Sequence, residues 1–116
     1  MTKTGGFTVT IPTDVEGDGS VIPENFVLED AYPNPFNPMT TIRFGLPERS
    51  SVAIRVYDVS GRIVADLVNA QMQAGMFQVQ WNAASVSSGT YLVRMSAEST
   101  ESGKTFSTSK KVSLVK

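Results

Sequence analysis

The sequence of 116 residues contains neither cysteine nor histidine, and these two absences exclude most catalytic chemistry. Without cysteine there is no disulfide, no thiolate nucleophile and no zinc–thiolate centre. Without histidine the chain lacks the commonest general base near neutral pH and the usual metal ligand. No serine can be activated by a histidine, and no glycine-rich phosphate loop is present. We therefore predict that the protein is not an enzyme and binds no cofactor.

Net charge and long apolar runs are also scarce. Ten Lys and Arg residues nearly balance eleven Asp and Glu residues, so the net charge is −1 and nothing indicates a nucleic-acid partner. No apolar run is long enough to cross a bilayer. The hydrophobic content of 41% is that of an ordinary folded protein, and the length fits one domain with a modest core.

The first part of the chain differs in composition from the rest. Phe7–Ile11 alternates in polarity and could form a short strand, whereas Thr13–Pro23 is rich in Asp, Glu, Gly and Ser, as linkers are. We predict that residues 1–25 are a linker or the tail of an upstream domain. Residues 26–116 are predicted to form the folded domain.

Three acidic residues near the start are spaced like the first ligands of a calcium-binding loop. Asp14, Glu16 and Asp18 alternate as the first ligands of such a loop do. Asn25, however, stands where the loop needs a bidentate glutamate. The pattern therefore favours an acidic linker, and we predict no metal site.

After Pro38 apolar residues recur at every second position, which is typical of strands with one buried face. Polar turns interrupt the pattern, and Gly61 is expected to adopt a positive φ in one hairpin. Ile63–Val68 also has helical spacing, but a strand is favoured there. About seven short strands predict an all-β, antiparallel β-sandwich, with a barrel as the alternative. The predicted inward positions are Ile42, Phe44, Leu46, Val52, Ile54, Val56, Phe77, Val79, Trp81, Tyr91, Val93, Met95, Val112 and Leu114.

A proline-rich run precedes the first long strand. The run comprises Tyr32, Pro33, Asn34, Pro35, Phe36, Asn37 and Pro38. Each proline fixes φ, removes a backbone donor and restricts the residue before it, so the run cannot be a central strand. We expect a rigid crossing at the edge of the sandwich, with Tyr32 and Phe36 anchored on the core. Asn34 and Asn37 are expected to bond to nearby backbone.

The order of motifs resembles the C-terminal sorting domains of cargo for type IX secretion. It is also similar to the immunoglobulin-like module of flagellar hook-capping proteins. The resemblance covers about residues 25–116 and rests on several blocks besides the proline-rich run. These blocks are Thr40–Phe44, Leu46-Pro47, Val56–Val59, Gly61-Arg62, Ala74-Gly75, Val79, Trp81, Ser88-Gly89, Tyr91, Lys110–Val112 and Leu114–Lys116.

The resemblance implies an immunoglobulin-like sandwich that serves as a carboxy-terminal address. Such a domain is covalently linked to an upstream cargo domain and is read by outer-membrane secretion machinery, and the protein is secreted or held at the cell surface. The implied recognition residues are Gly89, Tyr91, Lys110, Lys111, Val112, Leu114, Val115 and Lys116.

Other interpretations of the same residues remain open. The domain could be a structural or carbohydrate-binding accessory sandwich. Trp81 and Tyr91 are expected in the core, which leaves Tyr57 as the better candidate for an exposed aromatic platform.

The lysines of the last strand also have two interpretations. Lys110, Lys111 and Lys116 could form a basic end recognised by an acidic partner, or they could keep a solvated edge strand from aggregating. An exposed last strand could also pair between two chains in a weak homodimer.

Overall fold

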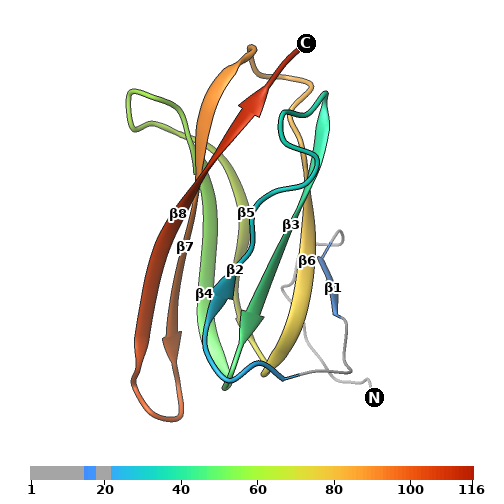
Figure 1. Cartoon of the computed structure of the whole chain (residues 1–116). Coiled ribbons are helices and arrows are strands. Elements are labelled where there is room, and N and C mark those ends of the chain that lie inside the picture. Colours follow the sequence, from blue (N-terminus) through green and yellow to red (C-terminus); the bar gives the residue numbers. More distant parts are fainter. Residues whose placement is uncertain (1–14, 18–21) are drawn as a thin grey trace.

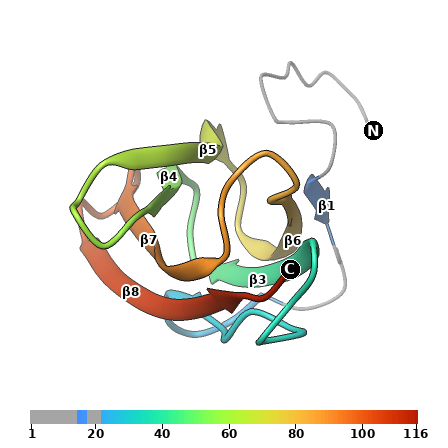
Figure 2. The ribbon, with the colours of Figure 1, turned by 90° about the horizontal axis from the view of Figure 1, so that it is seen from above.

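A computed structural model describes residues 15–17 and 22–116, and every named element in it is a β-strand (Figure 1). Two antiparallel sheets, β1-β6-β3-β2 and β5-β4-β7-β8, face each other (Figure 2). The predicted all-β, immunoglobulin-like sandwich is therefore confirmed. The strands are β1 (Val15–Gly17), β2 (Val27–Leu28), β3 (Met39–Leu46), β4 (Ser50–Tyr57), β5 (Ile63–Met72), β6 (Gly75–Asn82), β7 (Gly89–Ser99) and β8 (Thr105–Leu114).

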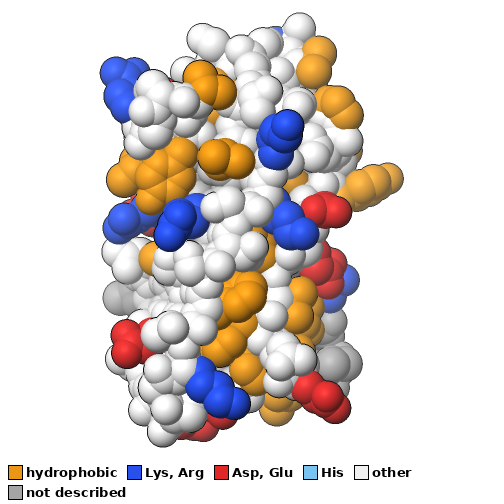
Figure 3. Space-filling model, turned by 60° about the vertical axis from the view of Figure 1, so that its left-hand side comes forward, with side chains coloured by type: hydrophobic (Ala, Val, Ile, Leu, Met, Phe, Trp, Pro, Cys, Tyr) orange, Lys and Arg blue, Asp and Glu red, His pale blue; other side chains and the backbone are white. Residues whose placement is uncertain are grey.

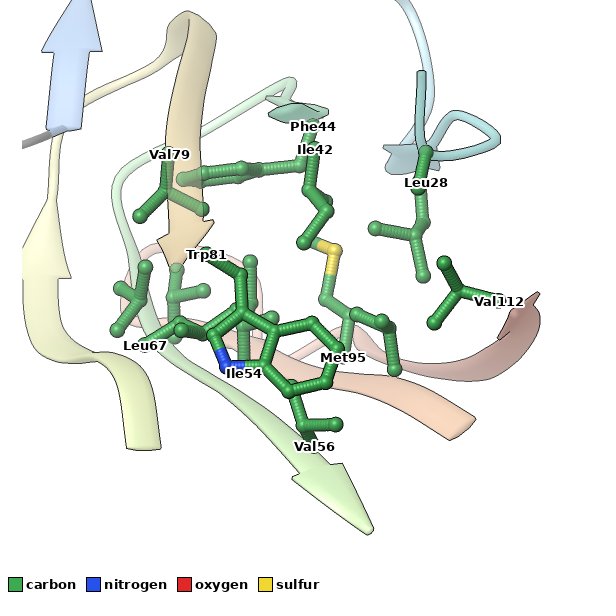
Figure 4. Close-up of a cluster of buried hydrophobic side chains, with 14 of the residues drawn as sticks. Leu28, Ile42, Phe44, Ile54, Val56, Leu67, Val79, Trp81, Met95 and Val112 are labelled. Carbon is green, nitrogen blue, oxygen red and sulfur yellow. The ribbon is translucent and has the colours of Figure 1, made fainter. Parts of the chain in front are cut away.

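The core lies between the two sheets and is built mainly from alternate residues of the long strands (Figure 4). In β4 the alternation is complete, since Val52, Ile54 and Val56 are buried while their neighbours are not. Each such side chain contributes about 1.5–3 kcal/mol when fully buried. All but one of the inward positions predicted from the period of two are buried. The exception, Phe77, is half-buried and stacks on Phe44 with ring centroids 5.6 Å apart.

The irregular strand β5 explains why its sequence also had helical spacing. The register between β4 and β5 shifts between Ile54 and Arg55 and again between Val56 and Tyr57. A bulge of this kind adds a residue and breaks the alternation. As a result the adjacent residues Leu67 and Val68 are both buried. The favoured strand is confirmed over its whole length.

The hairpin between β4 and β5 is organised by Asp58. Its Oδ1 accepts hydrogen bonds from the Ser60 hydroxyl at 2.6 Å, the Ser60 N–H at 2.9 Å and the Arg62 N–H at 3.1 Å. The hydrogen bonds from the Ser60 hydroxyl and then the Arg62 N–H hold the pKa of Asp58 below its ordinary value. Gly61 has φ of 91°, as predicted, because the backbone must reverse there.

The segment predicted to be a linker contains a short paired strand. The backbone of β1 pairs with β6, with Val15 opposite Val79 and Gly17 opposite Phe77. The domain boundary near residue 25 stays a prediction. Phe7–Ile11, and the Asp14 and Asp18 of the calcium comparison, lie outside the described residues. The described residues contain no helix long and apolar enough to span a membrane.

Candidate functional site

The proline-rich run lies against the end of the last strand. Asn34 Oδ1 accepts a hydrogen bond from the Ser113 N–H at 2.9 Å, and Asn34 Nδ2 donates to the Lys111 carbonyl at 3.2 Å. The Phe36 N–H donates to the Ser113 carbonyl at 2.9 Å, and the Val115 N–H donates to the Phe36 carbonyl at 3.0 Å. We call this contact between residues 32–38 and 111–115 the run–strand junction. It partly covers an edge strand that would otherwise be open.

The other side of the run is fastened to the opposite sheet. Tyr32 and Thr41 exchange two backbone hydrogen bonds of 2.9 and 3.0 Å. The buried Thr40 hydroxyl donates to the Pro33 carbonyl at 2.8 Å, and the Ala83 N–H donates to the Pro38 carbonyl at 2.8 Å. The peptide bonds before all three prolines of the run are cis. Through its hydrogen bonds the run joins β3 of one sheet to β8 of the other, at the edge of the sandwich as predicted.

An aromatic row supports the junction from the inside. The ring centroids of Phe36 and Trp81 are 5.3 Å apart, and those of Trp81 and Tyr91 are 5.4 Å apart in an edge-to-face arrangement. The Tyr91 hydroxyl donates a hydrogen bond to the Ser87 carbonyl. The predictions that Trp81 and Tyr91 belong to the core and that Phe36 is a core anchor are confirmed.

The prediction that Tyr32 is also a core anchor is wrong, because its side chain is 80% exposed. Tyr32 is attached through its backbone, which exchanges hydrogen bonds with Thr41. The prediction for Asn34 is wrong as well. Its side chain bonds to a strand 77 and 79 positions away rather than to nearby backbone.

The lysines of the last strand lie in three different surroundings. Lys110 Nζ lies 3.4 Å from Asp30 Oδ1, whereas Lys111 is exposed and shares the outer face of its sheet with Leu92. Lys116 Nζ donates to the Ala84 carbonyl at 2.8 Å. The three side chains therefore do not form a single basic cluster. The structure instead brings the C-terminal residue onto the loop between β6 and β7.

The two glycine motifs lie in separate places. Gly89 begins β7 and pairs with Leu114, so it lies next to the run–strand junction. Gly61 and Arg62 lie in the β4–β5 hairpin, where their backbones form hydrogen bonds with Asp58. These two residues are not part of the junction.

Two residues that the sequence analysis placed in family motifs, but not among the recognition residues, make hydrogen bonds beside the junction. Thr40 lies on the same face of β3 as Ile42 and is 1% exposed. A polar residue at an inward position needs a hydrogen-bond partner, and this is the feature by which the sequence could have pointed to Thr40. Ser88 Oγ accepts a hydrogen bond from the Lys116 N–H at 3.0 Å. The motif block marks Ser88, but nothing local predicts this hydrogen bond, because the partner lies 28 positions away.

The family model of the secretion system C-terminal sorting domain matches residues 30–110. The chain belongs to this family. Domains of this kind mark proteins that are secreted or attached to the cell surface through the type IX secretion system, and the family is in general not catalytic. The matched range contains the whole proline-rich run and most of β8, and it ends one residue before the β8 part of the junction.

One solved structure that resembles the chain is PorZ of Porphyromonas gingivalis, described as an essential bacterial surface component of the type-IX secretion system. The sequences are 23% identical, the TM-score is 0.48, and the similarity covers 77% of this chain. It covers only 11% of PorZ, so the chain spans about a tenth of that protein's length. No curated protein matches the chain.

Proposed function

We propose that this sorting domain directs an upstream cargo domain across the outer membrane by presenting the run–strand junction to the secretion machinery. The observation that carries the proposal is the set of hydrogen bonds that joins the proline-rich run to residues 111–115. These bonds make one surface of the proline-rich run, which is a family motif, and the segment 111–115. The domain has no catalytic role in this proposal.

The residues proposed for recognition divide into two groups by exposure. Gly89, Lys111, Val115 and Lys116 are exposed, and Lys110 is half-buried beside Asp30. Tyr91, Val112 and Leu114 are buried, with exposed fractions of 7%, 0% and 2%. A receptor that reads the folded domain would touch the first group. The buried residues would act by holding the surface in shape.

The proposal is tested by fusing residues 1–116 behind a fluorescent reporter with a periplasmic export signal, in a host that has type IX secretion. We expect the reporter at the cell surface or in the medium. The double variant Lys111→Glu with Val115→Asp changes only exposed side chains, so it should fold normally and leave the reporter in the periplasm. Arg49→Glu with Val59→Asp makes the same change in charge at exposed turns away from the junction and serves as the matched control.

Two outcomes would contradict this proposal. If the reporter with the intact domain stays in the periplasm, the domain is not a sufficient address in that host. If the junction variant is exported as well as the control, recognition does not use the junction.

We also propose a weak homodimer through the open part of β8. The run bonds to residues 111–115, and between Thr105 and Lys110 the described residues provide β7 as the only strand partner. Sedimentation at increasing concentration should then show a dimer, which Ser107→Pro should abolish by removing an N–H that faces the open edge. A monomer at millimolar concentration would contradict this proposal.

A further inference from the structure

The outer face of the sheet β5-β4-β7-β8 carries a shallow hollow of about 580 Å³. Its floor is formed by the small side chains of Ala53, Ser96 and Ser107, which lie side by side on three adjacent strands. Asn69 and Gln71 line it from β5. The volume falls in the range of about 300–1,000 Å³ that is typical of small-molecule sites. The lining offers hydroxyl and amide groups that both donate and accept hydrogen bonds.

Two arginines face each other next to this floor. Arg55 of β4 and Arg94 of β7 are direct cross-strand partners, and Arg94 also lines the hollow. The Cβ atoms of such partners are about 4.5–5.5 Å apart, and like charges in this position destabilise a sheet. Asp66 Oδ2 lies 3.7 Å from Arg55 Nε, which is beyond hydrogen-bonding distance, and this Nε is buried without a hydrogen-bond partner. Within the part of the chain that the structure describes, Arg94 has no ion pair.

The charge around the arginine pair is unbalanced. Lys111 lies on the same face one alternate position farther along β8, about 7 Å away along the strand. Glu98 also lines the hollow, but it is two alternate positions away from Arg94 in the other direction, about 13 Å along the strand. Asp66 borders Arg55 from β5, so it is the carboxylate next to the arginine pair, and Lys111 adds a third cation on the other side of the pair. An anionic group placed at the pair would relieve the repulsion and gain charge-assisted hydrogen bonds.

An apolar row borders the arginines on the side away from the hollow. Tyr57 of β4 is half-buried and pairs with Ile63 of β5 and Leu92 of β7, which are 54% and 42% exposed. Figure 3 shows orange side chains bordered by blue ones on the upper part of this side of the molecule. An aromatic ring between aliphatic side chains offers a flat apolar surface beside the charges.

We propose that this face binds an acidic oligosaccharide, with a uronate carboxylate on Arg55 and Arg94. One neighbouring sugar ring packs on Tyr57, and another lies over the Ser96 and Ser107 hydroxyls. A peptide fits less well, because a strand adds to a sheet at its edge through backbone groups, and this site is on the face. The residues that would contact the sugar, namely Arg55, Arg94, Tyr57, Ser96 and Ser107, lie outside the run–strand junction, so the proposal stands or falls independently of export.

The test is titration of residues 1–116 with a tetragalacturonate by calorimetry and by ¹H–¹⁵N NMR. We expect saturable binding that weakens with salt and chemical-shift changes at Ala53, Arg94, Ser96 and Ser107. Arg94→Gln and Arg55→Gln should each weaken binding about tenfold or more, as expected for a charged hydrogen bond. Arg49→Gln is the matched control, since Arg49 is an exposed arginine in the turn before β4. It should leave the affinity unchanged.

Three results would overturn the proposal. The first is the absence of chemical-shift changes at tetragalacturonate concentrations up to about 10 mM, which would mean that the dissociation constant is well above the millimolar range. The second is equal binding of the fully methyl-esterified tetrasaccharide, which lacks the carboxylates, or of tetraglutamate, which lacks the sugar rings. The third is equal weakening by Arg49→Gln, which would show that binding is non-specific attraction between charges.

Discussion

The two ends of the sandwich are closed by different chemistry. At the end that carries the C-terminus, the run–strand junction is held by amide and backbone hydrogen bonds above the aromatic row. At the opposite end, one carboxylate joins two turns, because Glu48 Oε1 accepts hydrogen bonds of 2.6 Å from both the Ser99 and Ser102 hydroxyls. Ser99 Oγ in turn accepts from the Glu101 and Ser102 N–H groups at 3.0 Å.

This difference should make the two ends respond differently to acid. The junction is made by neutral groups, so its strength should not vary with pH. The opposite end depends on an ionised carboxylate, since the hydrogen bonds from Ser102 and then Ser99 hold the pKa of Glu48 below its ordinary value. The hydrogen bonds of the run–strand junction therefore join neutral groups, whereas those that join the two turns at the opposite end depend on an ionised carboxylate.

Trp81→Ala should have the largest effect, because this ring is 4% exposed and contacts both Phe36 and Tyr91. We expect a loss of about 3–5 kcal/mol in the free energy of unfolding, measured by urea denaturation at pH 7. Val59→Ala, at a position that is 85% exposed, should change it by less than about 0.5 kcal/mol. A loss below about 1 kcal/mol for Trp81→Ala would show that the aromatic row does not support the junction.

Asn34→Ala should cost about 1–2 kcal/mol, because it removes both hydrogen bonds to β8. Asn37→Ala is the matched control, since Asn37 also precedes a proline of the run but has no side-chain hydrogen bond within the described residues. We expect Asn37→Ala to cost less than about 0.5 kcal/mol by the same urea assay. Equal losses for the two variants would mean that Asn34 does not fasten the run.

Glu48→Gln should show that the two ends of the sandwich contribute to stability with different dependence on pH. The folded-state pKa of Glu48 lies below the unfolded value of about 4.5, so its contribution is present above that value. The contribution is lost as the pH falls through the folded-state pKa. The stability difference between wild type and Glu48→Gln should therefore shrink in urea titrations from pH 6 to pH 3. The difference between wild type and Asn34→Ala should stay constant, and parallel behaviour of the two differences would refute the comparison.

Tyr32→Ala should have the smallest effect on stability. The ring is 80% exposed, so we expect a change in the free energy of unfolding of less than about 0.5 kcal/mol, measured by thermal unfolding. Phe36 lies four residues farther along the same run, and its ring is 2% exposed. Phe36→Ala should therefore lower the free energy of unfolding by about 3–5 kcal/mol. If Tyr32→Ala proves as costly as Phe36→Ala, the run is not oriented with Phe36 alone facing the core.

Where residues alternate along one strand, the sequence predicted their burial well. Ile42 and Phe44 in β3 and Val112 in β8 follow the period of two and are buried. In the proline-rich run no period is available, and the sequence did not distinguish the buried Phe36 from the exposed Tyr32. Their difference depends on which side of the run faces Trp81, and that is set by contacts with other strands.

The amino-acid sequence by itself determined that the protein is an all-β sandwich, which faces of its strands are buried, and the family to which it belongs. These properties follow from the alternation of neighbouring residues and from motif order, which are local. Tertiary structure alone decided that Asn34 reaches Ser113 and that Arg55 faces Arg94. Both depend on the pairing of strands far apart in sequence, and strand register is set by packing of the whole sandwich rather than by any segment within it.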